Sequence, residues 1–216
     1  MSYNLRLVKD EKLKNCINIK NRIVFSLVGL IAAFALVLSG CNSEEEYYET
    51  EIVIDKYGQI TENIVETFDK DYYNADELQQ EFVNAISEYN NSYGSEEIKL
   101  KSYEVKDGRV FVTLNFTGPS DYENFTNEEM FVGSINDAYD NGYTMSVSLK
   151  GIENGDIIGK VQVMGMKDRD IIILSEPVKV MTYKDIAYVS ANVDPVGKRE
   201  ARILGESGGL AYIVLK

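Results

Sequence analysis

The sequence predicts an α+β fold made mainly of antiparallel strands and hairpins, with one long amphipathic helix and one short helix. Most of the chain after residue 48 consists of short stretches in which apolar and polar residues alternate, as they do in half-buried strands. Residues 74–93 instead carry apolar side chains at helical spacing. The expected strands mostly follow one another without intervening helices, which favours α+β over α/β.

A hairpin is expected at Asp107-Gly108, because both positions of the tight turn need positive φ. A two-residue loop places Val105 and Val110 on one face of the hairpin, whereas Ile98 and Leu100 fall on the opposite face. Either a bulge shifts the register or both faces are partly covered.

The remaining strands are expected to be short. The apolar run 171–174 is typical of a strand covered on both faces. The expected strands cover residues 50–54, 59–68, 97–106, 109–116, 145–152, 171–174, 178–183, 186–190, 200–204 and 210–215. Residues 159–166 are expected to be strand or loop, and residues 194–197 and 205–209 are expected to be loops.

The long helix is expected to begin at Asn74 as N-cap, with Glu77 able to reach back, and to end at Gly94. Its apolar stripe is formed by Leu78, Phe82, Ala85, Ile86, Tyr89 and Tyr93. The short helix is expected over residues 134–141 and should end at Gly142. Its inward side chains should be Ile135, Ala138 and Tyr139.

The first forty residues are typical of a secretory signal. Residues 1–22 hold six basic and two acidic residues, a net charge of +4, and residues 23–38 are an apolar run. The run closes on Leu38-Ser39-Gly40-Cys41, which resembles the lipobox of bacterial lipoproteins. In that family the signal peptidase cuts before the cysteine, which then carries a diacylglyceryl lipid. An uncleaved anchor is the alternative, because residues 23–40 approach the length needed to span a bilayer.

The lipobox resemblance implies a domain organisation and a location. Residues 1–40 would be the lipoprotein signal peptide, residues 41–48 a short lipidated leader, and residues 49–216 a single extracytoplasmic α+β domain. The protein would lie on the outer face of the cytoplasmic membrane, in the cell envelope, attached through a lipid on Cys41. Segments 65–73, 105–110 and 209–212 are also similar to those of uncharacterised small lipoproteins of Gram-positive gut bacteria, a resemblance that implies no activity.

The composition limits the chemistry of the mature chain. Removing the charges of residues 1–40 from the totals of 22 basic and 35 acidic residues leaves 16 and 33, a net charge of −17. Such a surface repels nucleic acid and anionic head groups. The chain contains no histidine, and its two cysteines are Cys16, within the signal, and Cys41. Histidine and thiol chemistry and an internal disulfide are therefore excluded from the mature chain, and we predict no catalytic residue, metal or cofactor.

A non-catalytic binding or structural role is therefore expected, with a cell-envelope protein or glycan as partner. The alternatives are a carboxylate-only cell-envelope hydrolase, which needs two acids facing one cleft about 5 to 10 Å apart, and a small substrate-binding lipoprotein. The second alternative is disfavoured because the 176 residues left after removal of residues 1–40 are few for two lobes around a ligand.

Three groups of residues are candidates for surface roles. The tyrosine pairs Tyr47-Tyr48 and Tyr72-Tyr73 suit recognition surfaces, but the favoured interpretation is that they are amphipathic residues at the edge of a modest core. The basic cluster Lys198-Arg199 with Arg202 is expected to pair with acids or to present an anion site. Residues 69–74 begin like a calcium loop, but Asn74 and Gln80 stand where the EF-hand spacing requires Gly and Glu. Helix-capping acids are therefore expected there, and a looser calcium site built from Asp69 and Asp71 is the alternative.

Overall fold

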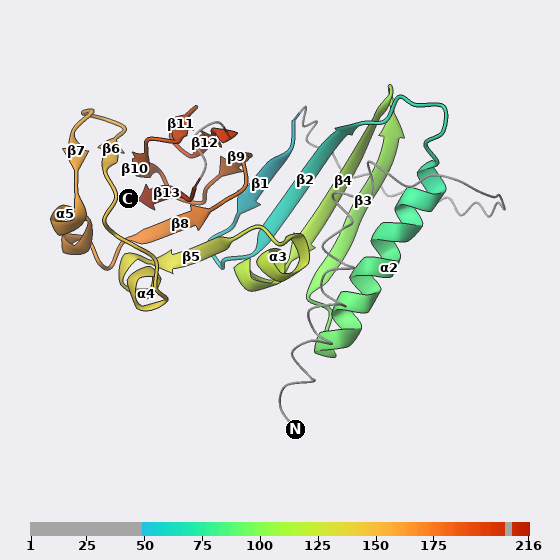
Figure 1. Ribbon diagram of the computed structural model, residues 1–216, viewed down its shortest axis with the longest axis horizontal. Coiled ribbons are helices and arrows are strands. Elements are labelled where there is room, and N and C mark those ends of the chain that lie inside the picture. Colours follow the sequence, from blue (N-terminus) through green and yellow to red (C-terminus); the bar gives the residue numbers. More distant parts are fainter. Residues whose placement is uncertain (1–48, 206–208) are drawn as a thin grey trace.

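The structure is a computed structural model that describes residues 49–205 and 209–216. These residues form two β-sheets and four helices (Figure 1). The predicted α+β class is confirmed, because strands dominate and the pairings between the described strands are antiparallel except for the parallel pair β1–β9. None of the described helices is long and apolar enough to cross a membrane. The predicted signal, Cys41 and the Tyr47-Tyr48 pair lie outside the described residues.

Seven strands form the first sheet, sheet A, in the order β11-β12-β9-β1-β2-β4-β3. Their bounds are β1 Glu51–Ile54, β2 Ile60–Thr67, β3 Ile98–Lys106, β4 Arg109–Phe116, β9 Lys179–Met181, β11 Val193–Pro195 and β12 Glu200–Ile203. The second sheet, sheet B, has six strands in the order β5-β8-β13-β10-β6-β7. Their bounds are β5 Met130–Ser134, β6 Leu149–Gly151, β7 Ile157–Ile158, β8 Asp170–Leu174, β10 Ile186–Ser190 and β13 Ala211–Leu215.

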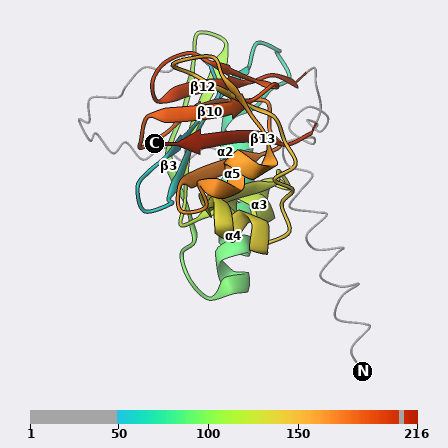
Figure 2. The same ribbon diagram turned by 90° about the vertical axis from the view of Figure 1, so that its left-hand side faces the viewer.

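The helices are α2 Ala75–Tyr93, α3 Pro119–Thr126, α4 Ile135–Asp140 and α5 Lys160–Gly165. The first core cluster joins α2, α3 and sheet B to one face of sheet A: it contains Phe82, Phe125 and Ile213 together with Ile52 and Phe116. A second cluster lies on the other side of sheet B, where α4 and α5 pack (Figure 2). The described chain is therefore layered, and one face of sheet A contributes to neither cluster.

Helix α2 has the ends that the sequence predicts. The side chain of Asn74 accepts hydrogen bonds from the backbone N–H groups of Asp76 and Glu77, and Gly94 ends the helix with φ of 72°. Its buried residues are Leu78, Phe82, Ala85, Ile86 and Tyr89, whereas Tyr93 is 53% exposed. Tyr93 was expected in the apolar stripe and instead stacks on Tyr89, with ring centroids 4.7 Å apart.

The number of helices differs from the prediction of one long and one short helix. Helix α3 was missed, although Pro119 in its first turn and the buried pair Tyr122 and Phe125 are signals of it. Helix α5 replaces the expected strand or loop at 159–166: Val163 is buried in the second cluster, and the Gln162 side chain accepts a hydrogen bond from Gly159 N–H at 3.3 Å. Packing of Val163 thus overrides the β-branched composition of this segment.

Helix α4 confirms the second predicted helix, with Ser134 as N-cap in a capping box with Asp137. Ile135 and Ala138 are fully buried, as expected. Tyr139 is 48% exposed, so the prediction that it points inward was wrong. In so short a helix, two buried positions three residues apart suffice to fix it against sheet B.

The β3–β4 hairpin turns at Asp107 and Gly108, which have φ of 52° and 71°. A register shift between Leu100 and Ser102 confirms the bulge alternative. The shift leaves Lys101 as the extra residue, so that Leu100 faces Leu114 across the hairpin. Ile98, Leu100 and Tyr103 consequently share the face that α2 covers.

Three expectations about the later strands have clear outcomes. The four apolar residues 171–174 of strand β8 are buried, as the apolar run predicts, and the strand pairs with β5 and β13. Residues 145–152 form only the three-residue strand β6. The loop expected at 194–197 is partly strand β11, which includes Pro195 because β11 is at the edge of sheet A and an edge position does not need the missing N–H.

Candidate functional site

The face of sheet A that belongs to neither core cluster is here called the open face. Along each strand, alternate side chains point to this face. In β2 it receives the side chains of Thr61, Asn63 and Val65, whereas the side chain of Ile60 points into the core. Its apolar residues Val53, Val65, Phe111 and Met181 are only half-buried. The open face thus offers polar and apolar side chains together on a broad sheet.

One polar residue from each of the seven strands lies in a single row across this face. The pairing register places each residue of the row directly opposite the next one. From β3 to β11 the row, here called the polar row, consists of Ser102, Thr113, Asn63, Glu51, Lys179, Arg202 and Asp194. With neighbouring strands about 4.8 Å apart, the row extends over roughly 29 Å.

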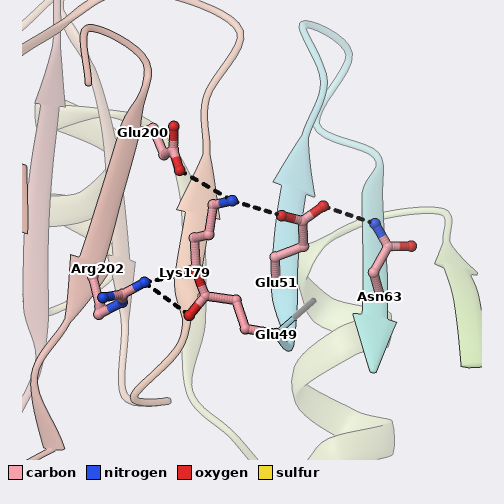
Figure 3. Close-up of polar contacts among 6 residues, drawn as sticks. All are labelled: Glu49, Glu51, Asn63, Lys179, Glu200 and Arg202. Carbon is pink, nitrogen blue, oxygen red and sulfur yellow. Dashed lines mark hydrogen bonds and ion pairs between the residues drawn. The ribbon is translucent and has the colours of Figure 1, made fainter. Parts of the chain in front are cut away.

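Side-chain contacts connect the middle of the row (Figure 3). Thr113 Oγ1 donates to Asn63 Oδ1 at 3.1 Å, and Asn63 Nδ2 donates to Glu51 Oε1 at 3.1 Å. The other oxygen of Glu51 lies 3.1 Å from Lys179 Nζ, which is also 3.0 Å from Glu200 Oε1. The contacts therefore run without interruption over the five strands β4, β2, β1, β9 and β12.

Lys179 is the electrostatic centre of this network. Its side chain is 19% exposed and that of Glu51 is 10% exposed, so this ion pair is largely shielded from water. Burial by itself opposes the charge on Lys179, but hydrogen bonds to Glu200 and Glu51 outweigh it and raise the pKa of the ammonium group. The site therefore keeps a fixed positive charge between two carboxylates.

Arg202 of the predicted basic cluster belongs to the polar row. Arg202 Nη2 contacts both carboxylate oxygens of Glu49, at 2.6 and 2.8 Å, and Arg199 Nε lies 2.8 Å from Asp185 Oδ1. Pairing with acids is thus confirmed for both arginines. Lys198 is exposed and has no ion pair with another described residue. No local sequence pattern predicts that Arg202 and Lys179 are neighbours, because the register between β9 and β12 is set by tertiary pairing.

The other predicted surface residues lie away from the open-face network. Tyr72 is 62% exposed and Tyr73 is half-buried with its ring 4.9 Å from that of Phe68, so one member of the pair points outward as expected. Asp69 pairs with Lys70 at 3.2 Å on the exposed segment before α2, and Asp71 is exposed. Among residues 49–205 and 209–216, no group of three or more acids is placed to hold a metal ion.

A second polar group, which the sequence analysis missed, lies in the interior. Glu62 points from β2 into the core and is 1% exposed, Tyr122 is fully buried, and Glu176 is 9% exposed. Tyr122 donates a hydrogen bond to Glu176, and burial followed by the negative charges of Glu62 and Glu176 raises the pKa of the phenol. The sequence feature that could have revealed this group is Glu62, a charged residue at a position of β2 where the alternation places side chains inward.

These interior carboxylates do not form the arrangement that glycan hydrolysis needs. Two acids must face a cleft that admits the polymer, whereas Glu62 and Glu176 are enclosed by the core. Their burial makes them a structural connection between β2, α3 and the segment after β8.

The structure also contains a groove of ≈ 720 Å³ between α2 and the edge strand β3, lined in part by Val83, Ile86, Asn90 and Leu100. The Asn90 side chain blocks one end of this edge: it accepts hydrogen bonds from Glu97 and Ile98 N–H and donates one to Ile98 C=O, at 2.8 to 2.9 Å. Lysines and a bulge on β3 further oppose the addition of another strand. The groove is therefore a weaker candidate than the open face.

Comparison with protein-family models, with curated proteins and with solved structures finds no match for this chain. Its function must be inferred from the geometry of its own residues.

Proposed function

We propose that the protein is a lipoprotein held on the outer face of the cytoplasmic membrane by a lipid on Cys41, and that residues 49–216 form one extracytoplasmic domain that binds cell-envelope glycan without catalysis. The charge of residues 1–22, the apolar run 23–38 and the lipobox at Leu38–Cys41 support the anchor. The polar row on the open face of sheet A is the observation that supports glycan binding.

The anchor is tested by mass spectrometry of the native protein. The expected N-terminus is a diacylglyceryl-modified Cys41, and Cys41→Ser should leave the protein unprocessed and without lipid. Cys16→Ser is the matched control, since Cys16 lies within the proposed signal, and it should be processed normally. An N-terminus that retains residues 1–40, or a secreted product without lipid, would contradict the anchor.

The polar row supports a glycan partner through its chemistry. Carboxylate, amide, hydroxyl and ammonium groups stand side by side over seven strands, and together they can donate to and accept from sugar hydroxyl groups. The half-buried side chains of Phe111 and Val65 lie beside the row and can cover the apolar face of a sugar ring. The row is elongated and thus fits an extended polymer better than a compact ligand.

A protein partner fits this surface less well. The cores of protein interfaces are depleted of Lys, Glu and Asp, yet the centre of the open face contains Glu51, Lys179 and Glu200. A glycan can hydrogen-bond to these groups while they keep their ion pairs, because each carboxylate and amide has further acceptor or donor positions.

In this proposal α2 acts as the amphipathic element that stabilises the binding sheet from behind. It packs on the opposite face of sheet A, through Phe82 and Ile86, and so leaves the open face to the ligand. The domain needs such packing because it has no disulfide available.

Glycan binding is tested by co-sedimentation of the full chain with purified cell-wall glycan. Asn63→Ala removes an amide from the middle of the row and should weaken binding about fivefold, the effect of one hydrogen bond of about 1 kcal/mol. Asn84→Ala is the matched control, because Asn84 is exposed on α2 on the other side of the sheet. If circular dichroism shows that both variants are folded and their affinities for the glycan are equal, the proposal is contradicted.

A further inference from the structure

Two exposed aliphatic side chains and two unpaired lysines lie on neighbouring elements at one end of the described chain. Val161 is 83% exposed and Ile157 is 65% exposed, the two highest values among the exposed aliphatic residues. Ile157 lies in β7 and Val161 lies in the first turn of the adjacent helix α5. In Figure 1 these elements are at the end of the molecule opposite to α2. Isolated exposed aliphatic residues are common, but a pair of this exposure beside cationic groups needs an explanation.

The lysines are placed by the same short elements. Lys150 lies directly across from Ile157 in the β6–β7 pair, on the face opposite to the buried pair Leu149 and Ile158. Lys160 precedes Val161 in the chain, and both Lys150 and Lys160 are exposed without an ion pair to any described residue. We call Lys150, Ile157, Lys160 and Val161 the β7–α5 tip.

Two acids lie in the turn before Ile157. Glu153 pairs with Lys216 at 2.5 Å, whereas Asp156 is exposed and has no ion pair with a described residue, so the two lysines of the tip outnumber the one unpaired acid of this turn. In a mature chain of net charge −17, the tip is thus a local region where positive charge and apolar surface coincide.

We propose that the β7–α5 tip contacts the anionic surface of the lipid bilayer. Lysine beside aliphatic side chains is the composition of membrane-interfacial surfaces, whereas protein interfaces are depleted of lysine. The proposal rests on the anchor at Cys41: a tethered domain meets the surface at high effective concentration, so a contact too weak for a free protein becomes occupied. From its net charge, the mature chain is expected to be repelled by anionic head groups. The proposal adds that this one end of the domain is attracted to them.

The test uses an environment-sensitive fluorophore on a single introduced cysteine, in the full lipidated chain reconstituted into vesicles of phosphatidylglycerol or phosphatidylcholine. If the sulfur of Cys41 carries the diacylglyceryl group, the introduced cysteine is the one free thiol of the mature chain. A label at Val161→Cys should be quenched by lipids that carry a spin label near the head group, and more strongly in phosphatidylglycerol. Val83→Cys is the matched control: Val83 is 44% exposed on α2, at the other end of the molecule, and its label should not be quenched.

The lysines are tested by Lys150→Gln combined with Lys160→Gln. Because each lysine near an anionic surface favours contact about fivefold, the double variant should lower the contact equilibrium in phosphatidylglycerol by about 30-fold. Quenching at Val161 that is as strong in phosphatidylcholine as in phosphatidylglycerol, and as strong in the double variant as in the chain with both lysines, would overturn the electrostatic contact.

Failure of the tip and failure of the anchor give different results. If the protein floats with the vesicles but its Val161 label is not quenched, the membrane contact of the tip is overturned and the anchor is not. If Cys41 carries no lipid, the same label is read on the unlipidated chain with Cys16 and Cys41 replaced by Ser, in the presence of saturating phosphatidylglycerol vesicles. Quenching then supports the contact of the tip, and its absence overturns it. A label that becomes shielded in native envelopes but is not quenched by spin-labelled lipid identifies a protein partner and also overturns the proposal.

Discussion

The hydroxyl of Tyr122 donates a hydrogen bond to the carboxylate of Glu176 inside the protein. Tyr122 lies on α3, which contacts β4 of sheet A and β5 of sheet B, and Glu176 lies in the segment between β8 of sheet B and β9 of sheet A. The contact therefore joins α3 to the segment that connects the two sheets, at a point where neither group reaches water freely. Because a buried carboxylate needs hydrogen bonds to offset its desolvation, this pair should contribute measurably to stability.

Tyr122→Phe should lower the free energy of unfolding by about 1 to 3 kcal/mol, because it removes a donor from a buried carboxylate without changing the ring. Tyr57→Phe is the matched control: Tyr57 is 76% exposed, and its substitution should change the free energy by no more than about 0.5 kcal/mol. Urea unfolding compares the two variants. If they were equally stable, the hydrogen bond to Glu176 would not stabilise the fold.

Phe82→Ala should lower the free energy of unfolding by about 3 to 5 kcal/mol, because the ring is 5% exposed in the first core cluster. Glu81→Ala, on the exposed side of α2, should change it by no more than about 0.5 kcal/mol. The same urea experiment measures both. Similar losses for the two would mean that the face of α2 that packs on sheet A is assigned wrongly.

Lys179→Met should cost about 3 kcal/mol of unfolding free energy, because it leaves the shielded carboxylate of Glu51 without its cation. Lys184→Met is the control, since Lys184 is 49% exposed in its pair with Asp170, and an exposed pair contributes about 0 to 1 kcal/mol. Thermal and urea unfolding should both separate the variants. A small loss for Lys179→Met would show that Glu51 is well solvated and that the polar row is held together less tightly than its contacts indicate.

The protein should lose stability in alkaline solution. Burial, followed by the negative charge of Asp76, raises the pKa of Tyr103 to about 12, and burial with the charges of Glu129 and Glu123 raises that of Tyr143 to about 12. The unfolded value is about 10, so the folded state holds these protons more tightly. The stabilisation is complete below pH of about 10 and is lost as the pH rises towards about 12.

The measurement is the urea midpoint of the full chain between pH 9 and pH 12. Tyr103→Phe also loses the hydrogen bond from Tyr103 to the Ala75 carbonyl, at 2.8 Å, so its midpoint should be lower at pH 9. Its decline with pH should nevertheless be shallower than that of the unchanged chain. Parallel declines would mean that Tyr103 does not contribute to the alkaline transition.

The sequence by itself determined those features that depend on neighbouring residues. Asn74 and Gly94 end α2 because a side-chain acceptor and a positive φ are local requirements, and Asp107-Gly108 forms its turn for the same reason. The apolar run of β8 predicted burial on both faces, because no alternation is needed where both sides are covered. The α+β class followed from the same local patterns.

Only the tertiary structure decided which segments became neighbours. The parallel pairing of β1 with β9 joins residues more than a hundred positions apart, and with it the contact between Glu51 and Lys179. Helix α5, where the sequence predicted strand or loop, buries Val163 against sheet B. Glu62, Tyr122 and Glu176 meet for a similar reason. The free energy of such contacts comes from burial and pairing between distant strands, and a single sequence carries the residues for these contacts but not the register that brings them together.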